Sequence, residues 1–338
     1  MAAVFSLPRL AQAEARAHQD PGTFVTFTKP APTKIRGNDT MQTHLDRVTP
    51  QETPSIAPSQ WLPRLIIGAV LNAVAWVSAW ARVGPLAHYS FFPLWLGFIF
   101  IVDALAEARS GTSLWRRNHR AFVALFIISA PFWWYFERLN RYVGNWHYLT
   151  PQHYGALAYV FWASLAFSTV IPAVLSVAEL LGAFGGGAYA VRPLVRLPAL
   201  AAITMIAIGV GTLALSLVFP HQCFPFLWLS LLLILDPIND RFGEPSVIGM
   251  LHAHFYARIV RLMAAGLVCG FFWEMWNYWS LPKWYYTVPY VGFGKVFEMP
   301  ILGYSGYLPF ALEIFVVYHF ARLITRRLGL FPPDYVRI

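Results

Sequence analysis

Long apolar runs, separated by short Arg-rich connections, make up most of this sequence. A helix that spans a membrane needs about 20 mainly apolar residues. The sixth run is shorter than this, so its helix must continue past Asp236 or be partly re-entrant, and Pro172 predicts a kink in the fourth helix. The pattern predicts eight spanning helices, within Leu65–Ala81, Phe91–Ala106, Ala121–Phe136, Ala156–Ala178, Leu197–Phe219, Phe224–Leu235, Ile259–Trp279 and Ile301–Ala321.

The composition supports an integral membrane protein. Of the 338 residues, 57% are hydrophobic and only 12% are charged, against about 25% charged residues in soluble domains. Residues 1–60 differ, because they are rich in Pro, Thr, Ala and Gln and lack a long apolar run. We expect them to form a disordered cytoplasmic segment. The formal net charge is +9, and excess Arg in a membrane protein marks cytoplasmic loops. The charge therefore predicts both termini on the cytoplasmic side of a bacterial inner membrane, and no nucleic-acid partner.

One arrangement of residue types occurs twice. A Glu is followed three residues later by an Asn, and then by a Trp and a Tyr two residues apart. The first copy contains Glu137, Asn140, Trp146 and Tyr148, and the second contains Glu274, Asn277, Trp284 and Tyr286. We therefore expect an all-α integral membrane fold of two tandem four-helix repeats, residues 61–190 and 191–338. An even number of helices in each repeat gives both repeats the same orientation, which makes the repeat parallel.

Two acidic pairs follow the same repeat, at the predicted cytoplasmic ends of the second and sixth helices. They are Asp103 with Glu107, and Asp236 with Asp240. Spacing of i, i+4 places both members of a pair on one helix face. Four converging carboxylates would bind Mg²⁺, and through it a diphosphate. The alternative is that each pair is neutralised by nearby Arg side chains. Mg²⁺ is the only cofactor that the sequence suggests.

The repeated Glu residues lie next to aromatic side chains near the opposite membrane face. Burial favours the protonated form of a carboxyl group, and such an acid can protonate even an alkene. Trp and Tyr faces stabilise the cation that develops. Glu313, in the last helix, is a further candidate acid. Alternatively, the Glu and Asn side chains join helices by hydrogen bonds. A contact from Arg138 or Lys283 would neutralise Glu274, so the surroundings of this carboxyl distinguish the two hypotheses.

The segment GNWHY, residues 144–148, resembles the membrane lycopene cyclase domain family, in which an acid at a helix end precedes a GxWxY motif and a Pro. The paired glutamates of that family are absent here. The resemblance covers about forty residues in each half and implies an acid-catalysed enzyme that acts on a carotenoid or another polyprenoid in the bilayer. The residues that carry it are Glu137, Trp146, Tyr148 and Pro151 in the first half and Glu274, Trp284, Tyr286 and Pro289 in the second.

A weaker resemblance to intramembrane prenyltransferases rests on the acidic pairs. The leading hypothesis from the sequence is an intramembrane enzyme with cyclase- or hydratase-like acid chemistry on an isoprenoid lipid. One alternative is a transporter or binding protein that uses the same acids in a central cavity. The others are metal-dependent prenyl transfer at the acidic pairs and a structural membrane protein without chemistry.

Overall fold

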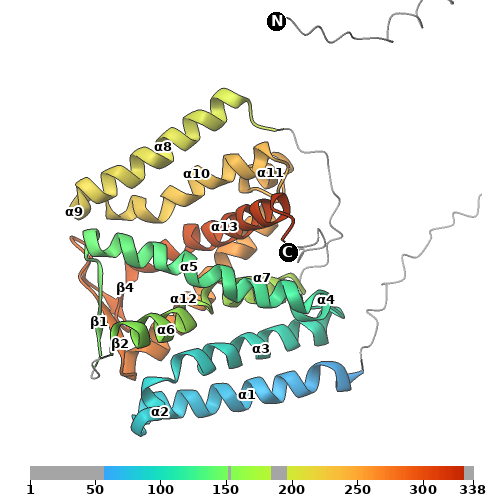
Figure 1. The fold of residues 1–338 in the computed structure, drawn as a ribbon, viewed down its shortest axis with the longest axis vertical. Helices are drawn as coiled ribbons and strands as arrows, with labels where there is room; N and C mark the ends of the chain where they lie inside the picture. Colours follow the sequence, from blue (N-terminus) through green and yellow to red (C-terminus); the bar gives the residue numbers. More distant parts are fainter. Residues whose placement is uncertain (1–56, 151–153, 184–195, 331–338) are drawn as a thin grey trace, which may run out of the picture. The chain divides into compact units, whose positions relative to one another are not determined.

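The computed structural model describes residues 57–150, 154–183 and 196–330 (Figure 1). We predicted disorder for residues 1–60. Residues 1–56 lie outside the described part of the chain, but the last residues of that segment are helical, because α1 begins at Pro58. Within the described residues, eight helices are long and apolar enough to cross a membrane. They comprise α1 (Pro58–Ala81), α3 (Phe91–Ser110), α5 (His119–Val143), α6 with α7 (Ala156–Phe167 and Val170–Ala183), α8 (Ala199–Val218), α9 to α10 (Pro220–Arg241), α12 (Tyr256–Trp279) and the 3₁₀ helix η2 with α13 (Ile301–Gly306 and Tyr307–Arg327).

Two of the predicted helices are irregular. The sixth helix continues past Asp236, as one of the two predicted alternatives required: α9 (Pro220–Cys223), the 3₁₀ helix η1 (Phe224–Phe226) and α10 (Leu227–Arg241) together give 22 residues. The fourth helix is interrupted between α6 and α7, after Phe167. Pro172 has no N–H for the carbonyl four residues earlier, which is that of Ser168. The predicted kink is therefore present, and it divides this helix in two.

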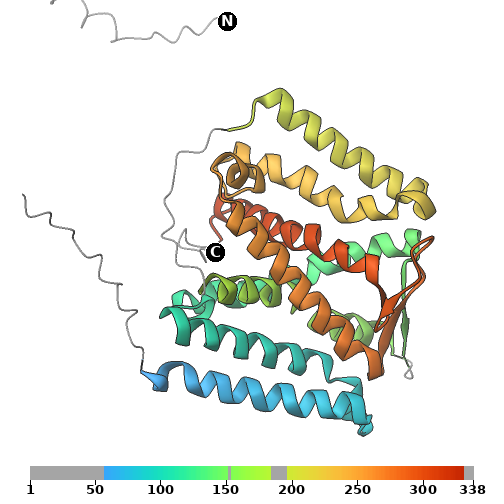
Figure 2. The ribbon, with the colours of Figure 1, turned by 180° about the vertical axis from the view of Figure 1, so that it is seen from behind.

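The long helices pack side by side in a fixed order (Figures 1 and 2). The contacts run from α1 to α3, α7, α12, α13, α10 and α8, and α5 packs against α6 and α7. The closest approaches between helices occur at glycines, because a glycine has no side chain to keep the two backbones apart. A Cβ at Gly97 of α3 would lie 2.6 Å from the backbone N of Asn72 in α1. α1 and α8 lie at the two edges of this series.

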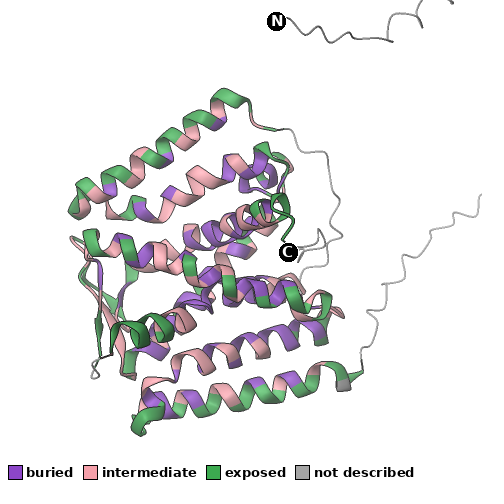
Figure 3. Ribbon diagram, in the orientation of Figure 1, coloured by how far each residue is buried: buried purple, intermediate pink, exposed green. Residues whose placement is uncertain are grey.

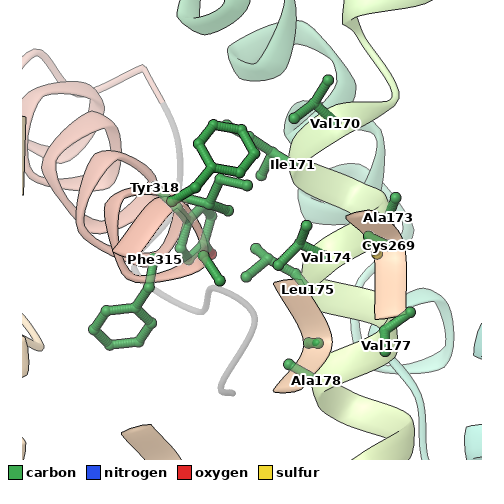
Figure 4. Packing of buried hydrophobic residues seen from close by; sticks show 14 of the residues in the cluster. Val170, Ile171, Ala173, Val174, Leu175, Val177, Ala178, Cys269, Phe315 and Tyr318 are labelled. Carbon is green, nitrogen blue, oxygen red and sulfur yellow. The ribbon is translucent and has the colours of Figure 1, made fainter. Parts of the chain in front are cut away.

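Helices inside this series are more buried than those at its edges (Figure 3). α3, α7 and α13 have about half or more of their residues buried, whereas α1, α6 and α8 are largely exposed. α7 packs against α3 and α12 and also contacts α13. Its Val174 and Leu175 belong to the same buried hydrophobic cluster as Cys269 of α12 and Tyr318 of α13 (Figure 4). The exposed faces of the outer helices are themselves apolar, with Val70 and Val77 of α1 more than half exposed. Such faces are typical of contact with lipid chains.

Short elements connect the long helices at both ends. Two pairs of strands lie at the end where α5 and α12 finish: β1 (Trp146–Leu149) pairs antiparallel with β2 (Lys283–Tyr286), and β3 (Lys295–Val296) pairs with β4 (Met299–Pro300). The sequence analysis did not predict strands. The other end carries α4 (Leu114–Arg117) and α11 (Val247–His252), and α2 (Gly84–His88) joins α1 to α3.

Candidate functional site

The β1–β2 ladder brings the two repeated sequence patterns together. Its register pairs Trp146 with Tyr286, and Tyr148 with Trp284. Each Trp of one copy therefore lies opposite the Tyr of the other copy. Alternate residues of a strand project to the same face, so all four side chains share one side of the ladder. The structure thus joins residues that are about 140 positions apart in the sequence.

The two repeated Asn residues hold these strands in place. Asn277 Nδ2 donates to the Trp284 carbonyl at 2.8 Å, and Asn277 Oδ1 accepts from the Trp284 N–H at 2.8 Å. Asn140 does the same for Trp146, with distances of 2.7 Å to the carbonyl and 3.3 Å from the N–H. From the sequence, both Asn residues were predicted to act beside the Glu residues, either in catalysis or as their hydrogen-bonding partners. Their amides are instead used in positioning the strands.

Three neutral donors surround one oxygen of Glu137. The Trp133 indole N–H donates to Oε1 at 2.9 Å, the Trp146 indole N–H at 3.0 Å, and the Tyr148 hydroxyl at 2.5 Å. Trp133 lies one turn before Glu137 on α5, and Trp146 and Tyr148 come from β1. Burial, together with the adjacent carboxylate, raises the pKa of the Tyr148 hydroxyl well above its usual range. Tyr148 therefore remains a protonated donor.

Glu274 has an equivalent set of donors, although one comes from a different element. The Tyr286 hydroxyl of β2 donates to Oε1 at 2.7 Å. The Trp284 indole N–H, also from β2, is shared: it donates to the Tyr286 hydroxyl at 2.9 Å and lies 3.4 Å from Oε1. The third donor is the Tyr307 hydroxyl at 2.8 Å, from the start of α13. The Glu274 side chain is fully buried. Burial and the neighbouring carboxylate also raise the pKa of Tyr286 well above its usual range.

No Lys or Arg of the described residues lies within ion-pairing distance of either carboxyl group. Lys283, one of the two cations considered from the sequence, forms an ion pair with Glu298 and donates to a backbone carbonyl. Arg138, the other, lies over the ring of Tyr142, 5.4 Å from its centroid. Both acids are therefore held by neutral donors alone. This is the arrangement that the sequence analysis associated with an acid catalyst.

An apolar cavity of about 690 Å³ lies beside both donor sets. Its walls include all six donors to the two glutamates: Trp133, Trp146, Tyr148, Trp284, Tyr286 and Tyr307. Side chains of α3, α6, η1 and α10 complete it. The donors to the Glu274 carboxyl line the cavity, whereas the carboxyl itself does not.

The acidic pairs at the other end of the helices are engaged locally. Arg64 lies 3.1 Å from Asp103 and 2.5 Å from Glu107, and Arg116 lies 2.9 Å from Glu107. Asp103 also accepts from a backbone N–H of α4. These contacts match the Arg-neutralised alternative for the first pair.

The carboxylates of the second pair accept hydrogen bonds from backbone N–H groups. Asp236 accepts from the backbone N–H groups of Val247 and Ile248 at the start of α11, at 2.6 and 2.9 Å. Asp240 accepts from the Leu197 N–H at 2.8 Å. The pairs lie on α3 and α10, which are separated by other helices (Figure 1). Within the described residues, no group of three His, Cys, Asp or Glu side chains could hold a metal, so the predicted convergence of four carboxylates is not formed.

Glu313 is also separate from the site for which it was predicted. It is fully buried on α13, six residues after Tyr307, and lies against α10 near the backbone of Leu231 and Leu232. The cavity wall includes Phe310 but not Glu313. The sequence analysis missed two site residues, Trp133 and Tyr307. Trp133 is one helical turn from Glu137, which is a usable signal, whereas nothing in the sequence marks Tyr307.

Comparison of this chain with models of protein families, with curated proteins and with solved structures gives no match. The function must therefore be argued from the site itself.

Proposed function

We propose that this protein is an intramembrane enzyme that performs acid-catalysed chemistry on an isoprenoid lipid. The observation that carries the proposal is the pair of buried glutamates, each held by three neutral donors, beside one apolar cavity. A buried carboxyl group without a cationic partner in a membrane protein favours a functional role over a structural one.

The size and lining of the cavity support a hydrophobic substrate. A volume of about 690 Å³ lies within the range of about 300–1,000 Å³ that is usual for small-molecule sites. An isoprenoid chain offers no polar group for ion pairing, and its carbon–carbon double bonds accept a proton. A carotenoid or a shorter polyprenoid belongs to this class of substrate.

In the proposed reaction, the Tyr286 hydroxyl gives its proton to an alkene carbon as the Glu274 carboxylic acid re-protonates the phenol oxygen. The substrate becomes a carbocation, which Trp and Tyr faces stabilise, and Glu274 becomes a carboxylate. Loss of a proton from a neighbouring carbon completes a cyclisation or an isomerisation, and addition of water completes a hydration. In each case the proton released, from the neighbouring carbon or from the added water, returns to the Glu274 carboxylate through Tyr286, so the enzyme is unchanged.

We also propose that the chain consists of two tandem parallel four-helix repeats, α1 to α7 and α8 to α13. The contacts of α3 with α1 and α7, and of α5 with α7, correspond to those of α10 with α8 and α13, and of α12 with α13. The β1–β2 register, in which each Trp faces the Tyr of the other copy, fits the same twofold relation.

We propose that both termini lie on the cytoplasmic side of a bacterial inner membrane, because of the distribution of Arg residues. Reporter fusions after Arg117 and after Ile338 test this orientation. Both are expected to report a cytoplasmic location, and a periplasmic signal from either would contradict the proposal.

The proposed chemistry is tested by Glu274→Gln, which keeps the shape of the side chain but removes its transferable proton. Lipids are extracted from cells that express the protein, the Glu274→Gln variant or a Glu179→Gln control, and are compared by mass spectrometry. Glu179 pairs with Arg117 at the opposite end of the helices. We expect one isoprenoid lipid to be converted by the wild type and the control but not by Glu274→Gln. Conversion by the variant, with equal amounts of folded protein, would contradict the acid role.

A further inference from the structure

Glu137 and Glu274 accept hydrogen bonds from similar donors, but Glu137 lines a cavity that Glu274 does not. Glu137 lines a second cavity, of about 610 Å³, together with polar and basic side chains at the strand end of the helices. Its other walls come from Trp134, Asn140, Arg141, Gly144, Trp146, His147, Tyr148, Tyr159 and Tyr285. We call this cavity the vestibule. Glu274 does not line it and is fully buried, whereas Glu137 keeps 9% of its surface exposed.

The vestibule is suited to water. Arg141 is exposed at its wall, and a charged guanidinium group is stable there only if it is hydrated. The His147 imidazole, also at this wall, bonds to the Thr287 hydroxyl at 2.8 Å. These groups lie next to the end of α5, where a spanning helix reaches the membrane interface. The apolar cavity, by contrast, is walled mainly by aromatic and aliphatic side chains.

Tyr148 connects the two spaces. It belongs to the walls of both the vestibule and the apolar cavity, and its hydroxyl bonds to Glu137 Oε1 at 2.5 Å. Trp146 and Tyr159 also border both cavities, but Trp146 donates through an indole N–H, which does not exchange a proton between two partners. A phenol can accept a proton from one neighbour while it donates its own to another.

We propose that Glu137 and Tyr148 form the route by which protons from water reach the apolar cavity. Glu137 takes a proton from water in the vestibule and becomes a carboxylic acid. This acid donates its proton to the Tyr148 oxygen as the Tyr148 hydroxyl proton passes into the cavity. Glu137 returns to the carboxylate, and one proton has moved from hydrated protons in the vestibule to the species in the cavity. The proton that this species later releases leaves by the same steps in reverse, so no net proton stays in the cavity. Glu274 does not line the vestibule in the described part of the chain, and it acts on the substrate through Tyr286 and Tyr307.

This inference deepens the proposed function, since it separates the role of one acid from that of the other, but its first test does not depend on turnover. The two native cysteines are replaced (Cys223→Ser and Cys269→Ala), and Glu137→Cys or Glu274→Cys is introduced. Each protein is reconstituted in nanodiscs, treated with the water-soluble reagent (2-sulfonatoethyl) methanethiosulfonate, and weighed by mass spectrometry. Arg141→Cys reports that the reagent reaches the vestibule wall.

We expect the reagent to modify Glu137→Cys and Arg141→Cys but not Glu274→Cys. If Arg141→Cys reacts and Glu137→Cys does not, or if Glu137→Cys and Glu274→Cys react equally, the aqueous route is wrong. Should a Cys variant fail to fold, infrared spectra of the wild type in D₂O decide the same question. At a pH low enough to protonate both groups, the carboxylic acid bands assigned with Glu137→Gln and Glu274→Gln are expected to exchange quickly for Glu137 and slowly for Glu274, and equal exchange would overturn the proposal.

The relay through Tyr148 is tested by Tyr148→Phe, with Tyr142→Phe as the control because Tyr142 is exposed on the outside of α5. Removing a proton-transfer group typically slows a reaction by about 10²–10⁴-fold, so we expect turnover in Tyr148→Phe to fall at least tenfold, and solvent deuterium in the product to fall with it. Unchanged turnover and labelling in Tyr148→Phe would overturn the relay. If no lipid is converted by any variant, the proposed function fails, while the thiol and infrared results still decide whether water reaches Glu137.

Discussion

Gly270 lies one turn before Glu274 on α12, and its lack of a side chain leaves room for the Tyr307 ring. A Cβ at this position would lie 2.6 Å from Tyr307 Cγ, and closer still to two other ring carbons. Gly270→Ala must therefore displace Tyr307, whose hydroxyl donates to Glu274 at 2.8 Å. The variant tests whether this close approach supports the site.

The expected cost follows from two effects. Overpacking of a close contact costs about 1–3 kcal/mol, and leaving a buried polar group without its hydrogen bond costs about 1–3 kcal/mol. Alanine in a helix regains about 0.5–1 kcal/mol relative to glycine. We therefore expect Gly270→Ala to lower the free energy of unfolding by about 2–5 kcal/mol.

The matched control is Gly211→Ala in α8. A Cβ at Gly211 meets no atom within 4 Å, so this variant keeps the helix-propensity gain and lacks the clash. Unfolding in detergent mixtures, followed by circular dichroism, gives the free energy for each protein. We expect Gly211→Ala to be as stable as the wild type or more stable by up to about 1 kcal/mol.

A double-mutant cycle with Tyr307→Ala identifies the contact itself. If the ring is the obstacle, Gly270→Ala should cost little once Tyr307 has been truncated, which gives a coupling energy of at least about 1 kcal/mol. Equal costs of Gly270→Ala with and without the Tyr307 ring would refute the steric argument. A Gly270→Ala protein as stable as Gly211→Ala would refute it as well.

Three further outcomes are expected from the same unfolding measurement. Tyr286→Phe should lower stability by about 1.5–3 kcal/mol, because a donor to a buried carboxyl is lost, whereas Tyr285→Phe, on the other side of β2, should change it by less than about 0.5 kcal/mol. Arg64→Met should cost about 3–5 kcal/mol because it leaves two buried carboxylates without their shared cation, whereas Arg117→Met, at a more exposed ion pair, should cost about 0.2–1 kcal/mol. Because the pKa of Tyr148 is raised in the folded state, the unfolded chain loses that proton first as pH rises above about 10; stability should fall over this range, and less steeply in Tyr148→Phe.

Local spacing made much of the site predictable. Glu and Asn three residues apart share a helix face, and a Trp and a Tyr two residues apart share a strand face. These relations hold for Glu274 with Asn277 and for Trp284 with Tyr286, so the composition of the site follows from the sequence. The eight helices follow from the apolar runs, because a span of fixed thickness demands a run of fixed length.

What the sequence did not predict depends on contacts between distant segments. Tyr307 reaches Glu274 only because α13 approaches α12 closely at Gly266 and Gly270. Glu313 was predicted as a further acid, but its side chain lies near the backbone of Leu231 and Leu232 in α10, away from the cavity wall. The acidic pairs failed to converge for a related reason. Each was predicted correctly on one helix face, but helix periodicity does not determine which helices become neighbours.

The third donor to each glutamate shows what the site requires. Trp133 stands four residues before Glu137, and Gly270 stands four residues before Glu274. In the first half the large side chain at this position is itself a donor, at 2.9 Å. In the second half its absence admits the Tyr307 hydroxyl from another helix, at 2.8 Å. Packing alone would be satisfied by any apolar side chain of suitable volume. Because two different routes each place three neutral donors on one carboxyl oxygen, the common requirement is the chemistry of that oxygen, as expected if the two acids transfer protons.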